Sequence, residues 1–301
     1  GGTGQGKIAG SISETMVVKP FLTAYDAFYP ALSKADIVPF LSEKARKYSM
    51  INTKNSVEDI QWNIEEGIVK QIFPSIQKAQ IRGNTGMHQS TLALAALVID
   101  NEELSREWME WIFAPGYIVR KENDRYRITG GNMAVALMDQ VDRDGFGDES
   151  SPNYNYLWVK EFITLANVTR HFHDKPEWNM FNMPKLKKMI HAFVPLIFSG
   201  KFTPLIGDTG AAGKPEVYIK KEDMILGYKV YRTEILAQAA YFLNGNSIEG
   251  IHDDIFSENP DKIAWEIQDV IQREGTLSSK SFMMPSYGLA GLRDGQSNEE
   301  R

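Results

Sequence analysis

The chain has 301 residues, 43% hydrophobic and 24% charged, which is enough for one large or two ordinary packed domains. The formal net charge of −6 argues against a general nucleic-acid binder, because phosphate backbones require a basic surface, although a local basic cleft can still accept an anionic substrate. The absence of cysteine excludes disulfides, thiolate metal sites and cysteine nucleophiles.

Hydrophobic periodicity predicts helices through the first half of the chain. Residues 1–13 are rich in Gly and Ser and favour a loop, and apolar side chains then recur at three- and four-residue spacing over residues 14–32 and 37–48. Isoleucines at every fourth position from 60 to 76 predict a helix over residues 56–79, which Pro74 can kink. Further helices are expected at residues 91–99 and 102–112, followed by irregular structure at 114–131.

The second half continues the helical pattern. Helices are predicted at residues 132–141, 156–172, 184–198, 229–243 and 261–272, with a Gly/Pro-rich loop at 200–214. No strand-like alternation precedes Phe282, where a strand can start before a polar end that we expect to be disordered. The fold class predicted is therefore all-α, and antiparallel helix pairs stacked around a centre would fit it.

Membrane insertion is not expected. The longest apolar run, residues 92–99, is too short to cross a bilayer. The sequence begins with glycine and not methionine, so the lack of a recognisable signal peptide carries little weight.

A first polar cluster precedes the apolar helix at residues 91–99. It contains Arg82, Asn84, His88 and Gln89. An asparagine amide can donate to a carboxylate, and a histidine can donate or accept a proton near neutral pH. The alternative is structural: Asn84 caps the helix, and the ring of His88 makes its hydrogen bonds within the fold.

A second cluster, residues 142–156, is acidic and rich in turn-forming residues, and it lies between two predicted helices. Polar loops held between packed elements often carry function. Tyr154 or Tyr156 can serve as a general acid or base, or either can be an amphipathic anchor in the core. The carboxylates are Asp142, Asp144, Asp148 and Glu149.

No metal site is predicted. The spacing of those four carboxylates does not match a calcium-binding EF-hand loop. His171 and His173 form a His-x-His pair, but no third zinc ligand lies nearby in the sequence.

Taken together, the two clusters resemble the heparinase II/III-like polysaccharide lyases and their alginate-lyase relatives over about residues 80–158. Gly83-Asn-Thr-Gly-Met-His88 is similar to the Asn- or His-bearing segment of that family. Asp144-Gly-Phe-Gly-Asp-Glu-Ser-Ser-Pro-Asn-Tyr154 is similar to the family segment whose tyrosine is catalytic. The sequence departs from the family at Thr85, where an aromatic residue is common, and at Asn155, where a histidine often follows the tyrosine.

The resemblance implies an incomplete (α/α) toroid of helical hairpins over residues 1–280. Residues 281–301 would then be a linker or the start of a β-sandwich domain, because Pro285-Ser-Tyr-Gly-Leu-Ala-Gly-Leu-Arg293 resembles the point where that domain begins. In many family members the β domain carries a further catalytic histidine and often a structural zinc. The resemblance therefore implies no cofactor within the present segment, and it assigns any structural metal to that further domain.

The implied activity is β-elimination on a uronic-acid-containing glycan, with an acidic polysaccharide or oligosaccharide as partner and a secreted or periplasmic location. Asn84 and His88 would neutralise the uronate carboxylate, and which of the two contacts it is left open. Tyr154 would be the acid or base. The substrate-binding residues implied are Arg82, Gln89, Glu149 and Tyr156.

Two other functions compete with this one. A glycoside hydrolase on a similar α/α scaffold would need two carboxylates facing each other across a cleft, and the sequence supplies no evident partner for Asp144, Asp148 or Glu149. A non-catalytic glycan-binding module would keep a groove but would not depend on the hydroxyl of Tyr154.

Overall fold

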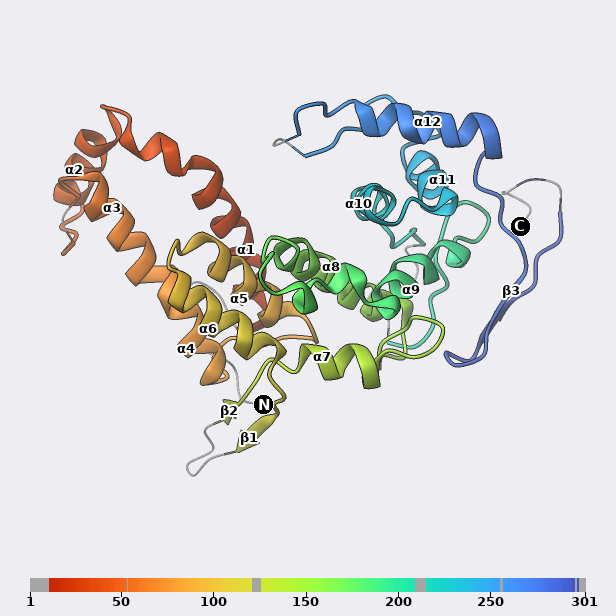
Figure 1. Cartoon of the computed structure of the whole chain (residues 1–301), viewed down its shortest axis with the longest axis horizontal. Coiled ribbons are helices and arrows are strands. Elements are labelled where there is room, and N and C mark those ends of the chain that lie inside the picture. The colour runs from red at the N-terminus through yellow and green to blue at the C-terminus, as the bar shows by residue number, and fades with distance from the viewer. Residues whose placement is uncertain are drawn as a thin grey trace. The chain divides into compact units, whose positions relative to one another are not determined.

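The computed structural model describes residues 11–52, 54–120, 126–208, 215–254, 257–295 and 297. These residues are mostly helical, as the periodicity predicts (Figure 1). The chain divides into two compact units. Unit 1 comprises Gly1–Val135 and Asn167–Phe172, and unit 2 comprises Ala136–Ala166 and His173–Arg301.

Unit 1 is built around α5 (Met87–Val98), which packs against three other helices. Those helices are α1 (Ser11–Phe28), α4 (Lys70–Gln77) and α6 (Glu102–Phe113). Leu92, Ala93 and Ala95 of α5 are fully buried. A helix that is apolar on all sides must be enclosed by other elements, so α5 forms the centre of this unit.

The helix predicted at residues 56–79 is present, but its pitch changes in the middle. α3 (Val57–Ile64) passes into a π-helical turn, η2 (Glu65–Val69), and α4 then continues to Gln77. Pro74 lies inside α4, where its ring nitrogen has no hydrogen to donate. The irregular turn therefore precedes the proline and does not coincide with it.

Unit 1 also contains a small hairpin that the sequence did not predict. β1 (Ile118–Arg120) pairs antiparallel with β2 (Tyr126–Ile128), and Ile118 faces Ile128. The expectations of irregular structure at 114–131 and of no strand before Phe282 are therefore wrong. Strands of three residues carry too little alternation to be recognised. Residues 121–125, which join the strands, lie outside the described part of the chain.

The remaining helices of unit 1 lie close to their predicted bounds. α1 begins at Ser11, inside the segment expected to be a loop, and ends in the short 3-10 helix η1 (Tyr29–Ser33). α2 (Ile37–Lys47) follows it. The helix expected at 132–141 is divided into α7 (Met133–Val135) in unit 1 and the π-helical turn η4 (Ala136–Gln140) in unit 2.

Unit 2 begins with η4 and contains most of α8 (Pro152–Thr169). The helix predicted at 184–198 is α9 (Pro184–Ala192) followed by the 3-10 helix η7 (Val194–Leu196). α12 (Lys262–Glu274) matches the helix predicted at 261–272. Part of the predicted loop at 200–214 lies outside the described residues, namely 209–214.

The single helix predicted at 229–243 is in fact two. α10 (Lys221–Tyr231) and α11 (Glu234–Leu243) are separated at Arg232, whose φ of +52° is left-handed. The Arg232 guanidinium pairs with Glu266 of α12 and lies 5.4 Å from the ring centre of Tyr228. These contacts stabilise a backbone conformation that residues other than glycine rarely adopt.

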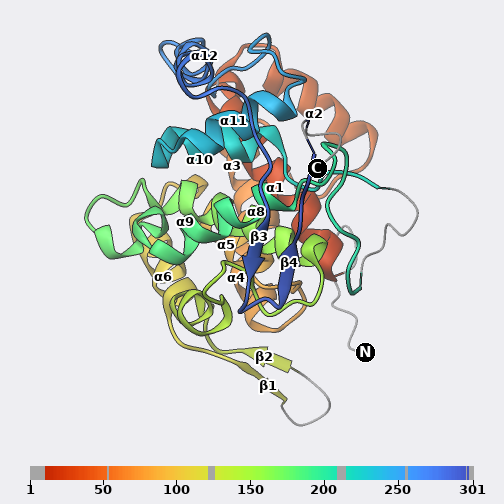
Figure 2. The ribbon, with the colours of Figure 1, turned by 90° about the vertical axis from the view of Figure 1, so that its right-hand side faces the viewer.

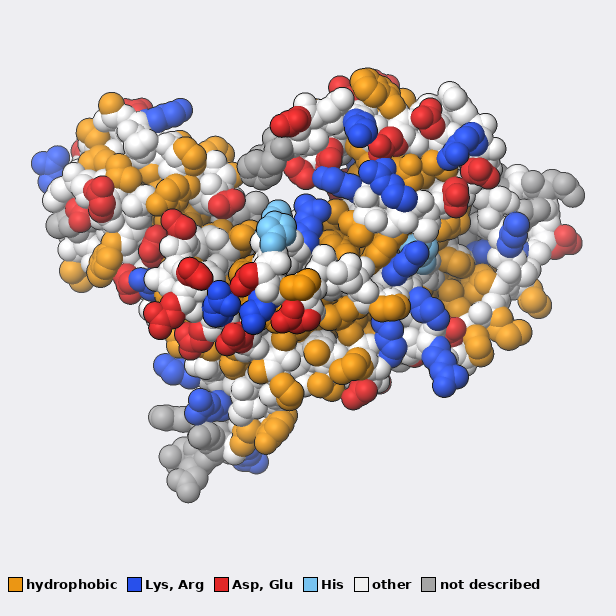
Figure 3. All heavy atoms as spheres, viewed as in Figure 1, with side chains coloured by type: hydrophobic (Ala, Val, Ile, Leu, Met, Phe, Trp, Pro, Cys, Tyr) orange, Lys and Arg blue, Asp and Glu red, His pale blue; other side chains and the backbone are white. Residues whose placement is uncertain are grey.

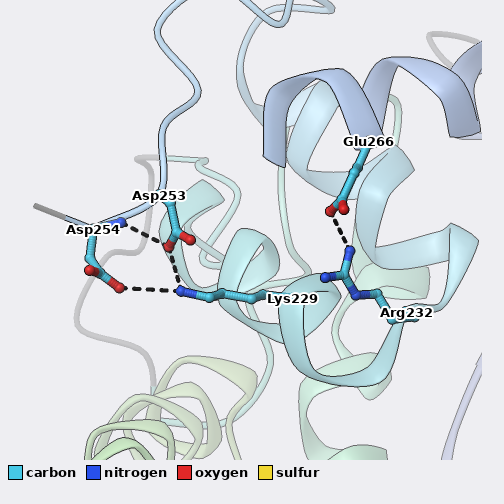
Figure 4. Close-up of polar contacts among 5 residues, drawn as sticks. All are labelled: Lys229, Arg232, Asp253, Asp254 and Glu266. Carbon is cyan, nitrogen blue, oxygen red and sulfur yellow. Dashed lines mark hydrogen bonds and ion pairs between the residues drawn. The ribbon is translucent and has the colours of Figure 1, made fainter. Parts of the chain in front are cut away.

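A second ion-pair group joins α10 to the loop before α12 (Figure 4). Lys229 Nζ lies 2.6 Å from the Asp253 carboxylate and 3.3 Å from that of Asp254. The amide of Asp254 donates to Asp253 Oδ1 at 2.8 Å. Burial opposes ionisation of Asp253, but hydrogen bonds from Lys229 and from the Asp254 amide outweigh it and lower the pKa of Asp253.

A hairpin lies at the C-terminal end of unit 2, where the sequence predicts that a strand starts. β3 (Phe282–Met284) pairs antiparallel with β4 (Leu289–Gly291), and Figure 2 shows the two side by side. The guanidinium of Arg293, just after β4, donates to the carbonyls of Pro195 (2.5 Å) and Ile197 (2.8 Å). The hairpin is therefore attached to the segment that follows α9. Residues 296 and 298–301 of the end expected to be disordered lie outside the described part.

Gly147 offers a direct test of packing in unit 2. A Cβ atom at this position would lie 2.5 Å from Cε3 of Trp158, a residue that is only 3% exposed. Because an indole ring held in a core cannot move aside cheaply, we expect Gly147→Ala to lower the free energy of unfolding by about 1–3 kcal/mol. Denaturant-induced unfolding followed by Trp fluorescence measures the change.

Gly67 supplies the matched control. It lies in the π-helical turn η2, and an added Cβ atom would meet nothing within 4 Å. Gly67→Ala should change stability by no more than about 1 kcal/mol, in the stabilising direction, because alanine is the better helix former. Equal destabilisation by both substitutions would contradict the packing argument.

Candidate functional site

The acidic stretch 142–156 is an ordered loop folded around one carboxylate. Asp142 Oδ1 accepts hydrogen bonds from the amides of Asp144 (2.8 Å), Gly145 (2.8 Å) and Phe146 (2.9 Å). The amide of Asp142 donates in return to the Phe146 carbonyl at 2.7 Å. Gly145 has a φ of +100°, which favours glycine. Asp142 therefore fixes the shape of the loop, and Phe146 is fully buried beneath it.

Asp144 attaches the C-terminal hairpin to this loop. Its Oδ2 accepts from the amides of Ser286 (2.6 Å) and Tyr287 (3.1 Å), in the turn between β3 and β4. The Tyr287 ring stacks on Phe146 with centroids 4.0 Å apart and planes inclined by 13°. The Tyr287 hydroxyl also donates to the Ser150 carbonyl at 3.1 Å. Sequence reasoning missed Ser286 and Tyr287, because their partners lie about 140 residues earlier and leave no local signal.

The first turn of α8 contains Tyr154, which belongs to the helix and not to the loop. Ser151 Oγ accepts from the amide of Tyr154 at 3.2 Å, and Pro152 is the first helical residue. Serine at the cap followed by proline is a strong helix start, and this signal could have placed the beginning of the helix four residues before the predicted Tyr156. The Asn155 amide donates to the carbonyls of Glu149 (2.7 Å) and Ser151 (3.2 Å). The helix start is thus bonded back to the acidic loop.

Tyr156 was expected to bind substrate, but the structure gives it a structural role. It is only 4% exposed, and its hydroxyl donates to the carboxylate of Asp223 and accepts from the amide of Lys220 at 2.8 Å. Burial, reinforced by the Asp223 charge, raises the pKa of Tyr156 far above its ordinary value, and burial also raises the pKa of Asp223. Tyr156 therefore joins α8 to the start of α10, as expected for an amphipathic anchor in the core.

Tyr154 differs from its two neighbours. Asn155 and Tyr156 are buried, whereas Tyr154 is partly exposed. Its backbone is held by Ser151, and across the described residues its hydroxyl has no hydrogen-bond partner. Tyr154 thus combines a fixed backbone with an available phenol, which a reacting group requires. Glu149, on the same loop, is partly exposed and is tied to the fold through its backbone.

The first cluster lies in unit 1, around the start of α5. Asn84 is in a turn, where its carbonyl accepts from the amide of Met87 at 3.1 Å. The cap of α5 is Gly86, with a φ of +96°, and not Asn84 as the structural alternative supposed. Because α5 begins at Met87, Asn84 and His88 do not share a helix face. Asn84 is partly exposed.

Gln89 was also expected to bind substrate, and here too the structure gives a structural role. It is 5% exposed. Its Oε1 accepts from the Gly86 amide at 3.0 Å, and its Nε2 donates to the Gly131 carbonyl at 2.8 Å. The side chain thus closes the start of α5 and connects it to the end of the β1–β2 hairpin. Arg82, the other residue in this group, is partly exposed and lies 5.6 Å from the ring centre of Tyr126.

His88 is held in its neutral form. The residue keeps some exposed surface, but its Nδ1 is enclosed and finds no hydrogen-bond partner in the described ranges. Its ring lies 6.4 Å from that of Trp111 in an edge-on arrangement. Burial lowers the pKa of His88 to about 4, because the imidazolium form loses its hydration. At neutral pH His88 can therefore donate or accept a hydrogen bond, but it carries no charge.

This burial predicts a pH dependence of stability. A histidine with a pKa of about 4 in the folded chain and 6.5 as its ordinary value binds its proton more readily when unfolded. The contribution of His88 to stability is therefore complete above about pH 6.5 and is lost as the pH falls through about 4, by about 3 kcal/mol in total. We expect His88→Gln to reduce the slope of unfolding free energy against pH in this window. An unchanged slope in urea titrations would contradict the assignment to His88.

The structure adds two findings that concern other kinds of site. In the part of the chain that the structure describes, no three or more His, Cys, Asp or Glu residues are grouped so that they could hold a metal ion. Among the same residues, no helix has both the length and the apolar character needed to cross a membrane.

The predicted site residues thus fall into two groups. Arg82, Asn84, His88 and Gln89 belong to unit 1, and Glu149, Tyr154 and Tyr156 belong to unit 2. Comparison of the chain with models of protein families, with curated proteins and with solved structures gives no match in any of the three.

Proposed function

We propose that the chain is a polysaccharide lyase that cleaves a uronic-acid-containing glycan by β-elimination. The observation that carries the proposal is the state of Tyr154. Its hydroxyl is available, whereas the neighbouring Tyr156 is buried and bonded to Asp223 and Lys220. Of the two candidate phenols, Tyr154 is therefore the one that can exchange a proton with a substrate.

The chemistry needs a proton transfer and a stabilised negative charge. The C5–H bond of the uronate breaks, the C4=C5 double bond forms, and the C4–O4 bond breaks while O4 takes up a proton. Tyr154 is proposed to take the C5 proton as a phenolate, to protonate O4 as a phenol, or to do both in turn; where it does only one, water supplies or accepts the other proton. The enolate-like charge that develops on the carboxylate requires hydrogen-bond donors at that position.

Asn84 and His88 are proposed as those donors. Asn84 is partly exposed and offers a neutral amide. His88 is neutral as well, because burial lowers the pKa of its imidazole to about 4. Either residue would therefore stabilise the carboxylate through a hydrogen bond and not through a full positive charge. Arg82 and Glu149, both partly exposed, remain the proposed substrate-binding residues.

The hydrolase alternative finds less support in the acidic loop. The carboxylate of Asp142 is engaged by three amides and that of Asp144 by two. A hydrolase needs two carboxylates, one free to give a proton and one free to attack or to activate water. Asp142 and Asp144 serve the fold instead, and of the candidate carboxylates only Asp148 and Glu149 remain, which are neighbours in the chain. The same features suit a loop that supports the helix carrying Tyr154.

The proposal includes a toroidal arrangement of the helices, a β-sandwich domain beginning near residues 281–301, and a secreted or periplasmic location. The activity is tested by incubating the full chain with polygalacturonate or alginate and following ultraviolet absorbance. The unsaturated uronate formed by β-elimination absorbs, whereas the product of hydrolysis does not. Release of reducing ends without an increase in absorbance would favour the hydrolase, and no cleavage of any polyuronate would contradict the lyase.

A further inference from the structure

Aromatic and basic side chains lie together on one face of α2 in unit 1. Phe40, Lys44 and Lys47 follow each other at spacings of four and three, which places them on the same side of the helix, and Tyr48 is the residue at which the helix ends. We call these four residues the α2 surface. Lys44 Nζ lies 5.1 Å from the ring centre of Phe40, and Lys47 Nζ lies 5.6 Å from that of Tyr48. Each ammonium group is therefore held beside an aromatic ring.

The α2 surface is open to solvent. Phe40 is 54% exposed and Tyr48 is 65% exposed, and α2 contributes only Ala45 to the core. Figure 3 shows hydrophobic side chains gathered over the part of unit 1 formed by α2 and α3. Large apolar groups exposed together usually mark a place where another molecule binds.

The charge of this segment indicates what kind of molecule that is. Residues 34–54 contain five basic and two acidic side chains, although the whole chain has 33 basic and 39 acidic ones. A local positive charge on an acidic protein attracts an anionic partner. The helical rise places residues 40 and 48 about 12 Å apart along the axis, so an extended anionic chain can contact both rings at once.

A protein partner or a second copy of this chain fits less well. The cores of protein interfaces are depleted of charged residues, whereas here an ammonium group accompanies each ring. A two-fold interface would bring the same patch of both copies together, and the lysines would then repel one another. Sugar rings instead offer C–H faces for aromatic rings and carboxylates for the lysines.

We propose that the α2 surface binds an anionic polysaccharide, in addition to and independently of the residues proposed for the elimination. The substrate class, a uronic-acid-containing glycan, rests on the proposed function. None of the α2 residues takes part in the proposed proton transfer. The surface would hold the polymer on the protein between cleavage events.

The test measures binding in the absence of cleavage. Affinity electrophoresis and calorimetry with polygalacturonate and with alginate are performed on the full chain carrying Tyr154→Phe. At low ionic strength, adding Lys44→Glu and Lys47→Glu should weaken binding at least about fivefold, because two attractive charges become repulsive. Adding Phe40→Ala and Tyr48→Ala should also weaken binding, and that loss should persist at high salt because it does not depend on charge.

The matched control carries Lys175→Glu and Lys187→Glu. Lys175 lies 5.6 Å from the ring centre of Trp178, and Lys187 lies 5.6 Å from that of Tyr231. The control therefore makes the same change in net charge at the same kind of contact elsewhere in the chain. Its binding should remain within about twofold of the parent, since neither lysine belongs to the α2 surface.

Several results would overturn the proposal. It fails if neither polyuronate binds, or if the Lys44→Glu, Lys47→Glu variant and the control weaken binding equally. It also fails if neutral dextran binds as tightly as the polyuronates, or if single-stranded DNA binds more tightly. Finally, it fails if the lysine variant loses self-association while its glycan binding is unchanged.

The outcomes also separate this proposal from the lyase proposal. Binding through the α2 surface without any unsaturated product from the parent chain would remove the lyase and leave the binding surface. Unsaturated product from the parent chain, together with unaltered binding by the Lys44→Glu, Lys47→Glu variant, would support the lyase and remove the binding surface.

Discussion

Tyr154→Phe is expected to reduce the formation of unsaturated uronate by about 10²- to 10⁴-fold, the range typical for removing a general acid or base. The substitution removes one oxygen atom. Across the described residues that oxygen has no hydrogen-bond partner, and the backbone of Tyr154 is held by Ser151 independently of the phenol. The fold should therefore survive, so a loss of rate would report on chemistry and not on structure. Initial rates from ultraviolet absorbance, with circular dichroism to confirm folding, measure the two effects separately.

Tyr156→Phe is the matched control for this variant. It removes the same atom two residues later, where the hydroxyl donates to Asp223 and accepts from the amide of Lys220. Its loss leaves the partly buried carboxylate of Asp223 without one donor, so we expect stability to fall by about 1–3 kcal/mol. The rate per folded molecule should change only a few-fold. The reverse pattern, in which Tyr156→Phe is inactive and Tyr154→Phe is active, would show that the wrong phenol was assigned.

Periodicity was sufficient for helices that expose one face and bury the other. α2, α6 and α12 lie within two residues of their predicted bounds, because their apolar residues recur at helical spacing and their ends are not shared with another element. It failed at Arg232, where α10 and α11 separate. No glycine or proline marks that break, and the residue that pairs with Arg232 is Glu266, 34 positions later. A left-handed residue supported from such a distance cannot be recognised in a local window.

The candidate residues show the same limit. Tyr154 and Tyr156 are equivalent in sequence, since both belong to an acidic, tyrosine-containing stretch. They differ in the structure because Asp223, 67 positions away, takes the hydroxyl of Tyr156. Gln89 was assigned to substrate, yet its amide is engaged by Gly86 and by Gly131, 42 positions away. Residue type predicts what a side chain can do, whereas long-range contacts decide whether it is available.

Asp142→Ala is the substitution from which we expect the largest loss of stability. The Asp142 carboxylate is the common acceptor for the amides of Asp144, Gly145 and Phe146, at 2.8 to 2.9 Å. Hydrogen bonds to a charged acceptor contribute about 1.5–3 kcal/mol each, and bonds that share one atom are not additive, so the expected loss is about 2–4 kcal/mol. Chemical denaturation followed by near-ultraviolet circular dichroism measures it, since Phe146 of this loop stacks with Tyr287.

Asp142→Asn separates the hydrogen bonds from the general effect of substitution. Asparagine retains a carbonyl oxygen that can accept the same three amides, but it loses the charge. We therefore expect it to cost about half as much as alanine, because neutral acceptors are about half as strong as charged ones.

The loop also carries Ser151, which begins the helix of Tyr154, so Asp142→Ala should reduce lyase activity along with stability. If both variants destabilise equally, the charge of Asp142 and not its three-fold acceptor geometry shapes the loop. If neither does, the loop is held by Phe146 and the hairpin turn that packs against it.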